Sequence, residues 1–285
     1  MSDGDGFGDD GFTVAIAGLG LIGGSLARDL AARGVRVLGY DANRATLHAA
    51  LAEGVIAAAP GDDWAGLEDA DALVLAVPVH AAAETLRDAL PRLGGVRLIT
   101  DAGSTKAEIV VQAARLGIGA RFVGAHPLAG DTRSGWAASR TGLFDGARVY
   151  LTPSAESSRA AADLARWLWT SVGGRTVELA ADEHDRLLAW TSHLPQVVSS
   201  ALGAALAERG IARGELGPGG RGATRLAASS PEVWRGILAD NAANVTAAIL
   251  EVERQLAAAR AAIESGDAEA IGRWMEIGHA WGERE

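Results

Sequence analysis

Hydrophobic positions follow two different patterns along this chain, and the change comes near residue 180. Before that point, short continuous apolar runs alternate with amphipathic stretches, which is typical of buried parallel strands connected by helices. We expect strands at 12–17, 35–40, 71–77, 97–100, 121–125, 148–152 and 175–179, a short strand near 56, and helices at 24–33, 44–53, 80–90, 106–116 and 155–172. This alternation predicts an α/β fold with a doubly wound, mostly parallel sheet of the Rossmann type.

Beyond residue 180, apolar residues recur only at helical spacing, at 182–208 (interrupted by Pro195), 231–265 and 268–281. The sequence therefore predicts an all-α C-terminal domain at 180–285 after the α/β domain at 11–179, with residues 1–10 a disordered, acidic tail. The helices carry longer apolar stripes than one copy can bury, so we expect a homodimer through 180–285.

A glycine-rich turn joins the first expected strand to its helix. Gly18-Leu19-Gly20-Leu21-Ile22-Gly23 has the GxGxxG spacing of a dinucleotide-binding turn, in which the glycines permit a tight turn and close approach of a pyrophosphate. The next strand ends in Asp41, where such folds bind the ribose hydroxyls of NAD. These residues predict NAD as the cofactor, and we add Val77 and Pro78, at the end of another buried strand, to the expected cofactor site.

The composition excludes several other classes of function. The 285 residues carry a net charge of −10 without a basic block, which disfavours nucleic acids and anionic membranes as partners. There is no cysteine, no apolar run near the ~20 residues of a membrane span and no histidine–carboxylate cluster at metal-ligand spacing. The first ten residues lack a signal-peptide pattern, so we expect a cytoplasmic protein that acts on a small molecule without a metal.

Polar motifs occur where such a sheet places its ligands and again within the helical domain. They are Asp101-Ala-Gly-Ser-Thr-Lys106, Gly124-Ala-His-Pro-Leu-Ala-Gly130, His184-Asp185, Ser192-His-Leu-Pro-Gln196 and the glycine-rich run 217–225 that ends in Thr224-Arg225. In this order and spacing, they resemble the prephenate/arogenate dehydrogenase family of tyrosine biosynthesis. The resemblance runs from about Thr13 to Asn244.

The resemblance implies roles for individual residues. His126 is expected to be the catalytic base, for which imidazole suits because its pKa lies near neutral pH, and Ser104 its partner. Arg225 matches a substrate carboxylate as a bidentate donor, with Arg221 a weaker candidate at the rim. His193 and Gln196 are expected to contact substrate, and for His184 a structural role at a helix start is as plausible as a functional one.

Three positions depart from the family pattern. Gln196 stands where many members have a second histidine, while Thr132 and Gly222 stand where many have acids. These departures concern the choice of substrate and leave the hydride chemistry intact. We expect NAD-dependent oxidative decarboxylation of prephenate to 4-hydroxyphenylpyruvate, with arogenate to tyrosine, or a 4-amino analogue of prephenate, as alternatives.

Two other classes of protein share parts of this layout. The β-hydroxyacid dehydrogenases combine a Rossmann domain with helices but use a lysine of the helical part as acid/base, and residues 182–265 contain none. An NAD-sensing binding module would explain the glycine turn but would leave Ser104, His126 and Arg225 without a purpose.

Overall fold

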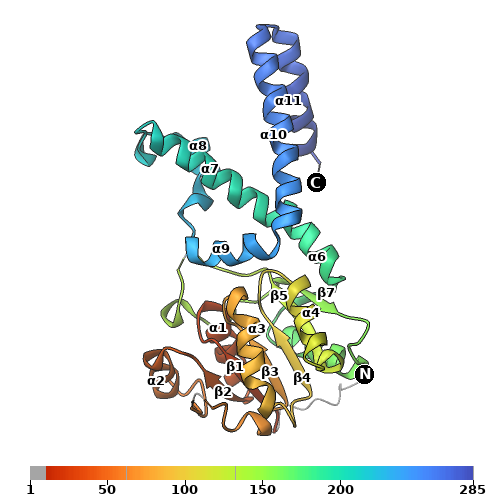
Figure 1. The fold of residues 1–285 in the computed structure, drawn as a ribbon. Coiled ribbons are helices and arrows are strands. Elements are labelled where there is room, and N and C mark those ends of the chain that lie inside the picture. Colours follow the sequence, from red (N-terminus) through yellow and green to blue (C-terminus); the bar gives the residue numbers. More distant parts are fainter. Residues whose placement is uncertain (1–10, 62, 132, 285) are drawn as a thin grey trace, which may run out of the picture. The chain divides into compact units, whose positions relative to one another are not determined.

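The computed structural model describes residues 11–61, 63–131 and 133–284, so the tail expected at 1–10 lies outside the described residues. The chain divides into two compact units, Met1–Leu187 with Ser229–Asp240 and Leu188–Ala228 with Asn241–Glu285 (Figure 1). The first unit contains the sheet and also a later helical segment, so its internal contacts extend past residue 180.

The first unit is built on a seven-stranded sheet in the order β2-β1-β3-β4-β5-β6-β7. The strands are β1 Thr13–Ala17, β2 Arg36–Tyr40, β3 Ala72–Leu75, β4 Leu98–Asp101, β5 Phe122–Pro127, β6 Arg148–Pro153 and β7 Arg175–Glu178. All neighbouring pairs are parallel except β5 and β6, which are antiparallel. The mostly parallel Rossmann sheet is confirmed, but the strand expected near residue 56 reduces to one bridge between Leu38 and Ala58.

Helices cover both faces of this sheet because successive strand residues point to opposite sides. Val14 and Ile16 of β1 pack in the core with α1 (Leu21–Ala31) and α5 (Arg159–Ser171). Ala15 and Ala17 pack with α3 (Val79–Ala89) and α4 (Ala107–Arg115) on the other face. The first unit also contains α2 (Arg44–Ala52), most of α6 (Ala181–Leu188) and α9 (Pro231–Asp240).

The described residues of the second unit form helices joined by turns and contain no strand. Its main elements are α7 (Leu194–Glu208), α8 (Pro218–Ala223), the short turn η7 (Arg225–Ala228), α10 (Ala242–Ser265) and α11 (Ala268–Gly282). Pro195 lies in the first turn of α7, directly after a π-helical turn at Ala189–His193, so it does not interrupt the helical structure. A proline lacks the N–H that the carbonyl four residues earlier needs, and the wider turn accommodates this loss.

The single helix expected over 231–265 is wrong, because the helix ends at Asp240 and α10 begins at Ala242. Asn241, between them, has φ −107° and ψ 25°, outside the helical range. The sequence pattern stays apolar at helical spacing across this break and therefore hides it.

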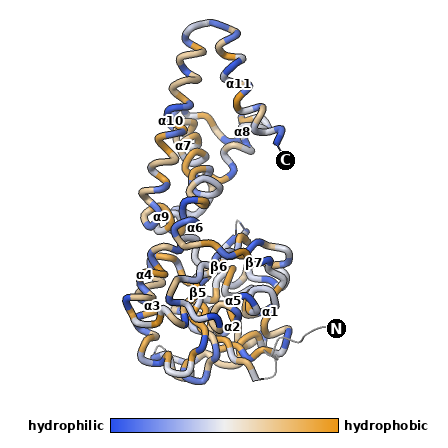
Figure 2. Tube along the Cα trace, turned by 90° about the vertical axis from the view of Figure 1, so that its right-hand side faces the viewer, coloured by the Kyte–Doolittle hydropathy of each residue, from blue (hydrophilic) through white to orange (hydrophobic). Residues whose placement is uncertain are grey.

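Large apolar side chains remain exposed on α10 and α11 of the second unit. They include Leu250, Leu256 and Ile263 on α10, and Ile277 and Trp281 on α11, each at least 60% exposed. Figure 2 shows hydrophobic and hydrophilic residues alternating along both helices. Among the described residues, no helix has the length and apolar character needed to cross a membrane.

Candidate active site

The glycine turn at the start of α1 has the backbone geometry that its sequence predicts. Gly18 has φ +89°, in the region that favours glycine, and a Cβ on Gly23 would lie 1.9 Å from the carbonyl oxygen of Gly18. At Gly20, by contrast, a Cβ would have nothing within 4 Å. The first turn of α1 has no side-chain cap, so its N–H groups face this open space and can bind phosphate.

A cleft of about 530 Å³ opens beside this turn. Five of the expected cofactor residues line it: Gly18, Gly20, Asp41, Val77 and Pro78. The Asp41 carboxylate accepts hydrogen bonds from the backbone N–H of Leu19 and of Asn43, each at 2.7 Å. Asp41 therefore ties the end of β2 to the glycine turn at the mouth of the cleft. Leu19, Leu21, Ile22 and Gly23 are not among the residues that line the cleft, and Leu19 is fully buried in the hydrophobic core.

Aromatic residues form part of the cleft that the sequence analysis did not predict. Tyr40 and Trp64 both line it, and their rings stack with centroids 4.6 Å apart. Burial, reinforced by the nearby carboxylates of Glu68 and Asp63, raises the pKa of Tyr40 to about 12, so its hydroxyl stays protonated. Trp64 lies in a loop without periodicity, and only its unusual φ of 59° in the structure marks it out.

A buried ion pair holds the chain just before His126. The ladder between β4 and β5 pairs Ile99 with Phe122 and Thr100 with Val123. Beyond these pairs, the Asp101 carboxylate accepts the N–H of Ala125 at 3.0 Å, and Lys106 Nζ donates to the Ala125 carbonyl at 2.8 Å and to Asp101. Burial lowers the pKa of Lys106, although the Asp101 carboxylate opposes the shift.

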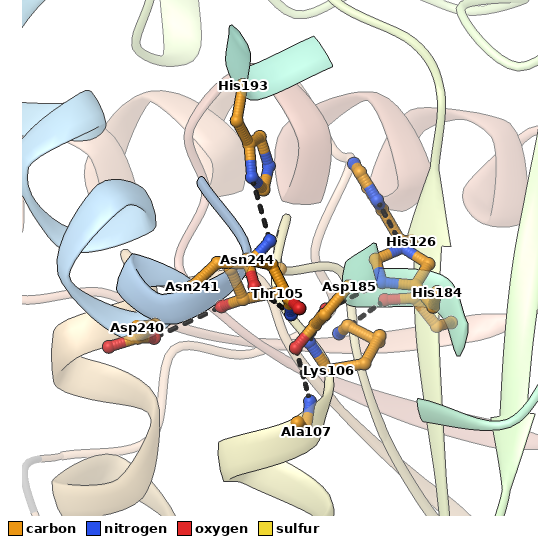
Figure 3. Close-up of polar contacts among 12 residues, drawn as sticks. Thr105, Lys106, Ala107, His126, His184, Asp185, His193, Asp240, Asn241 and Asn244 are labelled. Atoms are coloured by element: carbon orange, nitrogen blue, oxygen red, sulfur yellow. Dashed lines mark hydrogen bonds and ion pairs between the residues drawn. The ribbon is translucent and has the colours of Figure 1, made fainter. Parts of the chain in front are cut away.

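His126 belongs to a chain of side-chain hydrogen bonds (Figure 3). Its Nδ1 lies 2.9 Å from Nε2 of His184, and Nδ1 of His184 lies 2.8 Å from Oδ1 of Asp185. The same carboxylate accepts the N–H groups of Lys106 and Ala107 at the start of α4, each at 2.9 Å. His126 is 9% exposed and His184 is fully buried. The structure thus gives His184 and Asp185 partners that the sequence analysis left open.

Ser104 lies in the bend between β4 and α4 and is half-buried. Its hydroxyl makes no hydrogen bond with the described residues. We expected Ser104 to orient the imidazole of His126, but the partner on Nδ1 is His184. Ser104 therefore stays a candidate for contact with substrate.

The second unit holds a separate polar cluster around His193, at the end of the π-helical turn (Figure 3). Its Nδ1 lies 3.1 Å from the side-chain amide of Asn241, and Asn244 donates to Oδ1 of Asn241 at 2.8 Å. His193 and Asn241 are 1% and 3% exposed. Their partners here are neutral amides, whereas the chain behind His126 ends on a carboxylate.

Gln196 and the two arginines lie in the same unit. Nε2 of Gln196 donates to the Leu226 carbonyl at 2.8 Å and to Ser200 Oγ at 3.1 Å, which uses both amide hydrogens and secures η7 to α7. Its Oε1 is buried and has no hydrogen-bond partner among the described residues. Arg225, at the start of η7, and Arg221 are exposed. Gly222 is exposed beside them, and Thr132 lies outside the described residues.

Two family models cover most of the chain. The nucleotide-binding domain of prephenate dehydrogenase matches residues 26–178, and the dimerization domain of prephenate dehydrogenase matches residues 180–277. The prephenate dehydrogenase of Bacillus subtilis is 33% identical over 276 residues, which are 93% of this chain and 73% of that protein.

Solved structures agree with these matches. A crystal structure of prephenate dehydrogenase from Aquifex aeolicus, in complex with hydroxyphenyl propionate and NAD+, is 30% identical with a TM-score of 0.85 and covers 95% of this chain and 98% of that one. The arogenate dehydrogenase of Synechocystis is 27% identical with a TM-score of 0.81, over 94% of this chain and 98% of that one. By sequence and by fold, the chain belongs to the prephenate dehydrogenase family.

Proposed function

We propose that this protein catalyses the NAD-dependent oxidative decarboxylation of prephenate to 4-hydroxyphenylpyruvate. The observation that carries the proposal is the buried chain from Asp185 through His184 to His126, which presents an imidazole at the end of β5 in a chain of this family. A base is what removal of the ring hydroxyl proton requires.

The first unit fits NAD. The uncapped start of α1 and the open space at Gly20 suit the pyrophosphate, and Asp41 suits the hydroxyls of the adenosine ribose. Leu47, Pro60 and Trp64 give the cleft apolar walls for a planar base. When bound, NAD supplies the acceptor for the hydride that leaves C4 of the substrate ring.

His126 then handles one proton twice. Its imidazole takes the proton of the C4 hydroxyl as the C4–H bond breaks with both electrons and a carbonyl forms at C4. The bond between C1 and its carboxylate breaks next, CO₂ leaves, and the released electron pair makes the ring aromatic with its charge on the C4 oxygen. The proton on His126 returns to this oxygen, so the base ends the reaction unchanged.

Substrate recognition falls to the second unit. Prephenate is a dianion, and the exposed guanidinium of Arg225 can hold a carboxylate through two hydrogen bonds. Gln196 donates a hydrogen bond to the backbone of η7, which begins with Arg225, and this bond holds the backbone from which the arginine side chain extends. Arg221 adds positive charge four residues earlier, on α8.

Arogenate is a second candidate substrate, and the amide of Gln196 favours it. Because both of its N–H groups are donated within the protein, only the acceptor Oε1 remains for a ligand. An acceptor suits the ammonium of arogenate better than the ketone of prephenate.

We infer that the second unit forms a homodimer. Large apolar side chains on α10 and α11 are exposed to solvent although the two helices pack against each other, and such exposed apolar surface commonly marks an interface with another protein chain. Light scattering at micromolar concentration is expected to give twice the 29.2 kDa mass of the chain. A stable monomer would contradict this inference.

The activity is tested by mixing the protein with NAD and either prephenate or arogenate. Absorbance of the reduced cofactor is followed together with formation of 4-hydroxyphenylpyruvate or tyrosine. A β-hydroxyacid such as 3-hydroxyisobutyrate serves as the control substrate and is expected to give no reduction. The proposal fails if neither cyclohexadienyl substrate reduces NAD, and an arogenate preference above a hundredfold would replace prephenate as the substrate.

A further inference from the structure

Asp185 accepts three hydrogen bonds within the part of the chain that the structure describes. Its oxygens face Nδ1 of His184 and the N–H groups of Lys106 and Ala107, all at 2.8–2.9 Å. Burial alone would raise the pKa of the Asp185 carboxyl, but the hydrogen bonds from His184, Ala107 and Lys106 outweigh burial and hold this pKa below its usual range. The group is therefore a carboxylate, and a carboxylate only accepts.

This fixes where the hydrogens lie along the whole chain. Nδ1 of His184 must carry the hydrogen that Asp185 accepts. In a neutral ring, Nε2 of His184 is then an acceptor, so Nδ1 of His126 must carry the hydrogen between the two rings. Nε2 of His126 consequently has a lone pair. We propose that His184 and Asp185 are positioning residues that set the tautomer of His126, so that Nε2 is its basic nitrogen.

The arrangement also stabilises the charge that forms during the reaction. When Nε2 of His126 takes a proton, the hydrogen on Nδ1 stays where it is and its bond to His184 becomes charge-assisted. No proton passes from His126 to His184. The start of α4, whose N–H groups hold Asp185, prevents the carboxylate from turning away.

This proposal rests on the proposed function for the role of His126 as base, so its decisive test does not use activity. Imidazole ¹⁵N chemical shifts in histidine-labelled protein distinguish the two neutral tautomers from the doubly protonated ring. The six histidines are few enough to assign with His126 and His184 variants. We expect both rings of the wild-type protein to be neutral with the hydrogen on Nδ1.

Asp185→Asn is the variant that should reverse the direction of the hydrogen bonds from residue 185 through His184 to His126. An asparagine has one acceptor oxygen for three donors. When this oxygen stays on the N–H of Ala107, where Oδ2 of Asp185 lies, the NH₂ group replaces Oδ1 and faces His184. Nδ1 of His184 then accepts, Nε2 donates to His126, and Nε2 of His126 gains the hydrogen. Asp182→Asn is the matched control, because Asp182 lies on the same helix but is exposed and forms its ion pair with Arg186 on the surface.

Turnover gives a second readout. Asp185→Asn is expected to lower kcat by roughly 10³–10⁴, as the same exchange does by placing the wrong tautomer in serine proteases, with KM and NAD affinity changed less than threefold. His184→Gln retains an acceptor toward His126 and should keep kcat within about tenfold, whereas His184→Leu should lose roughly 10–100-fold. Asp182→Asn should leave kcat unchanged.

Three results would overturn the proposal. A doubly protonated His184 in the wild type would make it the donor to His126. A wild-type His126 with its hydrogen on Nε2 would do the same. An Asp185→Asn protein that melts at lower temperature but keeps the wild-type tautomer would leave Asp185 as a helix cap only. If the spectra show the hydrogen on Nδ1 of His126 but the protein turns over neither substrate, the proposed function fails while the tautomer assignment stands.

Discussion

Two buried histidines in this molecule are held by different kinds of partner. His126, in the first unit, is backed by His184 and then by the carboxylate of Asp185. His193, in the second unit, is backed by the amides of Asn241 and Asn244. A carboxylate fixes one direction of hydrogen bonding and, through His184, stabilises the positive charge that His126 gains during turnover. An amide offers both a donor and an acceptor and fixes neither direction.

This difference suggests that His126 transfers a proton, whereas His193 binds substrate. An imidazole that gains a proton during turnover needs a partner that stabilises the charged ring. An imidazole that only binds is better kept neutral, with amides around it. We therefore expect changes around His126 to appear in kcat and changes around His193 and Arg225 to appear in KM. The following measurements test this assignment of kcat effects to one histidine and KM effects to the other.

The largest effects on kcat are expected where the base or its tautomer is lost, and His126→Ala removes the base itself. Loss of the general base should lower kcat by roughly 10²–10⁴, while NAD affinity measured by fluorescence titration stays nearly constant. The exposed His48→Ala, on α2, is the control. A His126→Ala protein that retains more than a tenth of the wild-type kcat would show that His126 is not the general base.

Arg225→Ala should act on binding. A substrate carboxylate left without its partner costs about 2–5 kcal/mol. Since the carboxylate is present in the ground state as well as the transition state, the loss should appear mainly as a raised KM. Steady-state kinetics with saturating NAD measure both constants. A fall in kcat as large as the rise in KM would show that Arg225 also stabilises the transition state, which would contradict a role in binding alone.

Cofactor choice tests Asp41, on the side of the molecule that binds nucleotide. Its carboxylate, held by the N–H groups of Leu19 and Asn43, should repel a 2′-phosphate. NAD should be favoured over NADP at least tenfold in kcat/KM, or about 1.4 kcal/mol. Asp41→Asn should reduce this ratio without changing kcat with NAD. Equal use of both cofactors by the wild type would refute this role.

The smallest effect is expected for Asn241→Leu, which keeps the branched shape of the side chain but removes the amide behind His193. A net hydrogen bond is worth about 0.5–1.5 kcal/mol, so KM should rise roughly two- to tenfold at unchanged kcat. Thermal unfolding separates this loss from misfolding. A hundredfold fall in kcat in a well-folded variant would show that the second histidine also takes part in proton transfer.

The sequence predicted the sheet, its strands and the glycine turn, because continuous apolar runs and glycines with forced geometry are local signals. It did not predict the break at Asn241, where helical spacing continues on both sides. Nor did it predict that His184 contacts His126, because 58 residues separate them and only the fold brings β5 and α6 together. The motifs were visible, but their hydrogen-bond directions depend on which atoms meet in space.

Lys106 is the only lysine in the sequence, and its side chain is fully buried. Reagents that acylate amines therefore find no ε-amine on the surface of the folded protein. Lys106 becomes reactive only when the segment beneath His126 opens, because its Nζ is held by Asp101 and the Ala125 carbonyl. The rate at which a mild acylating reagent adds to Lys106, followed by mass spectrometry of the peptide, thus reports how often the catalytic edge of the sheet comes apart in the native protein.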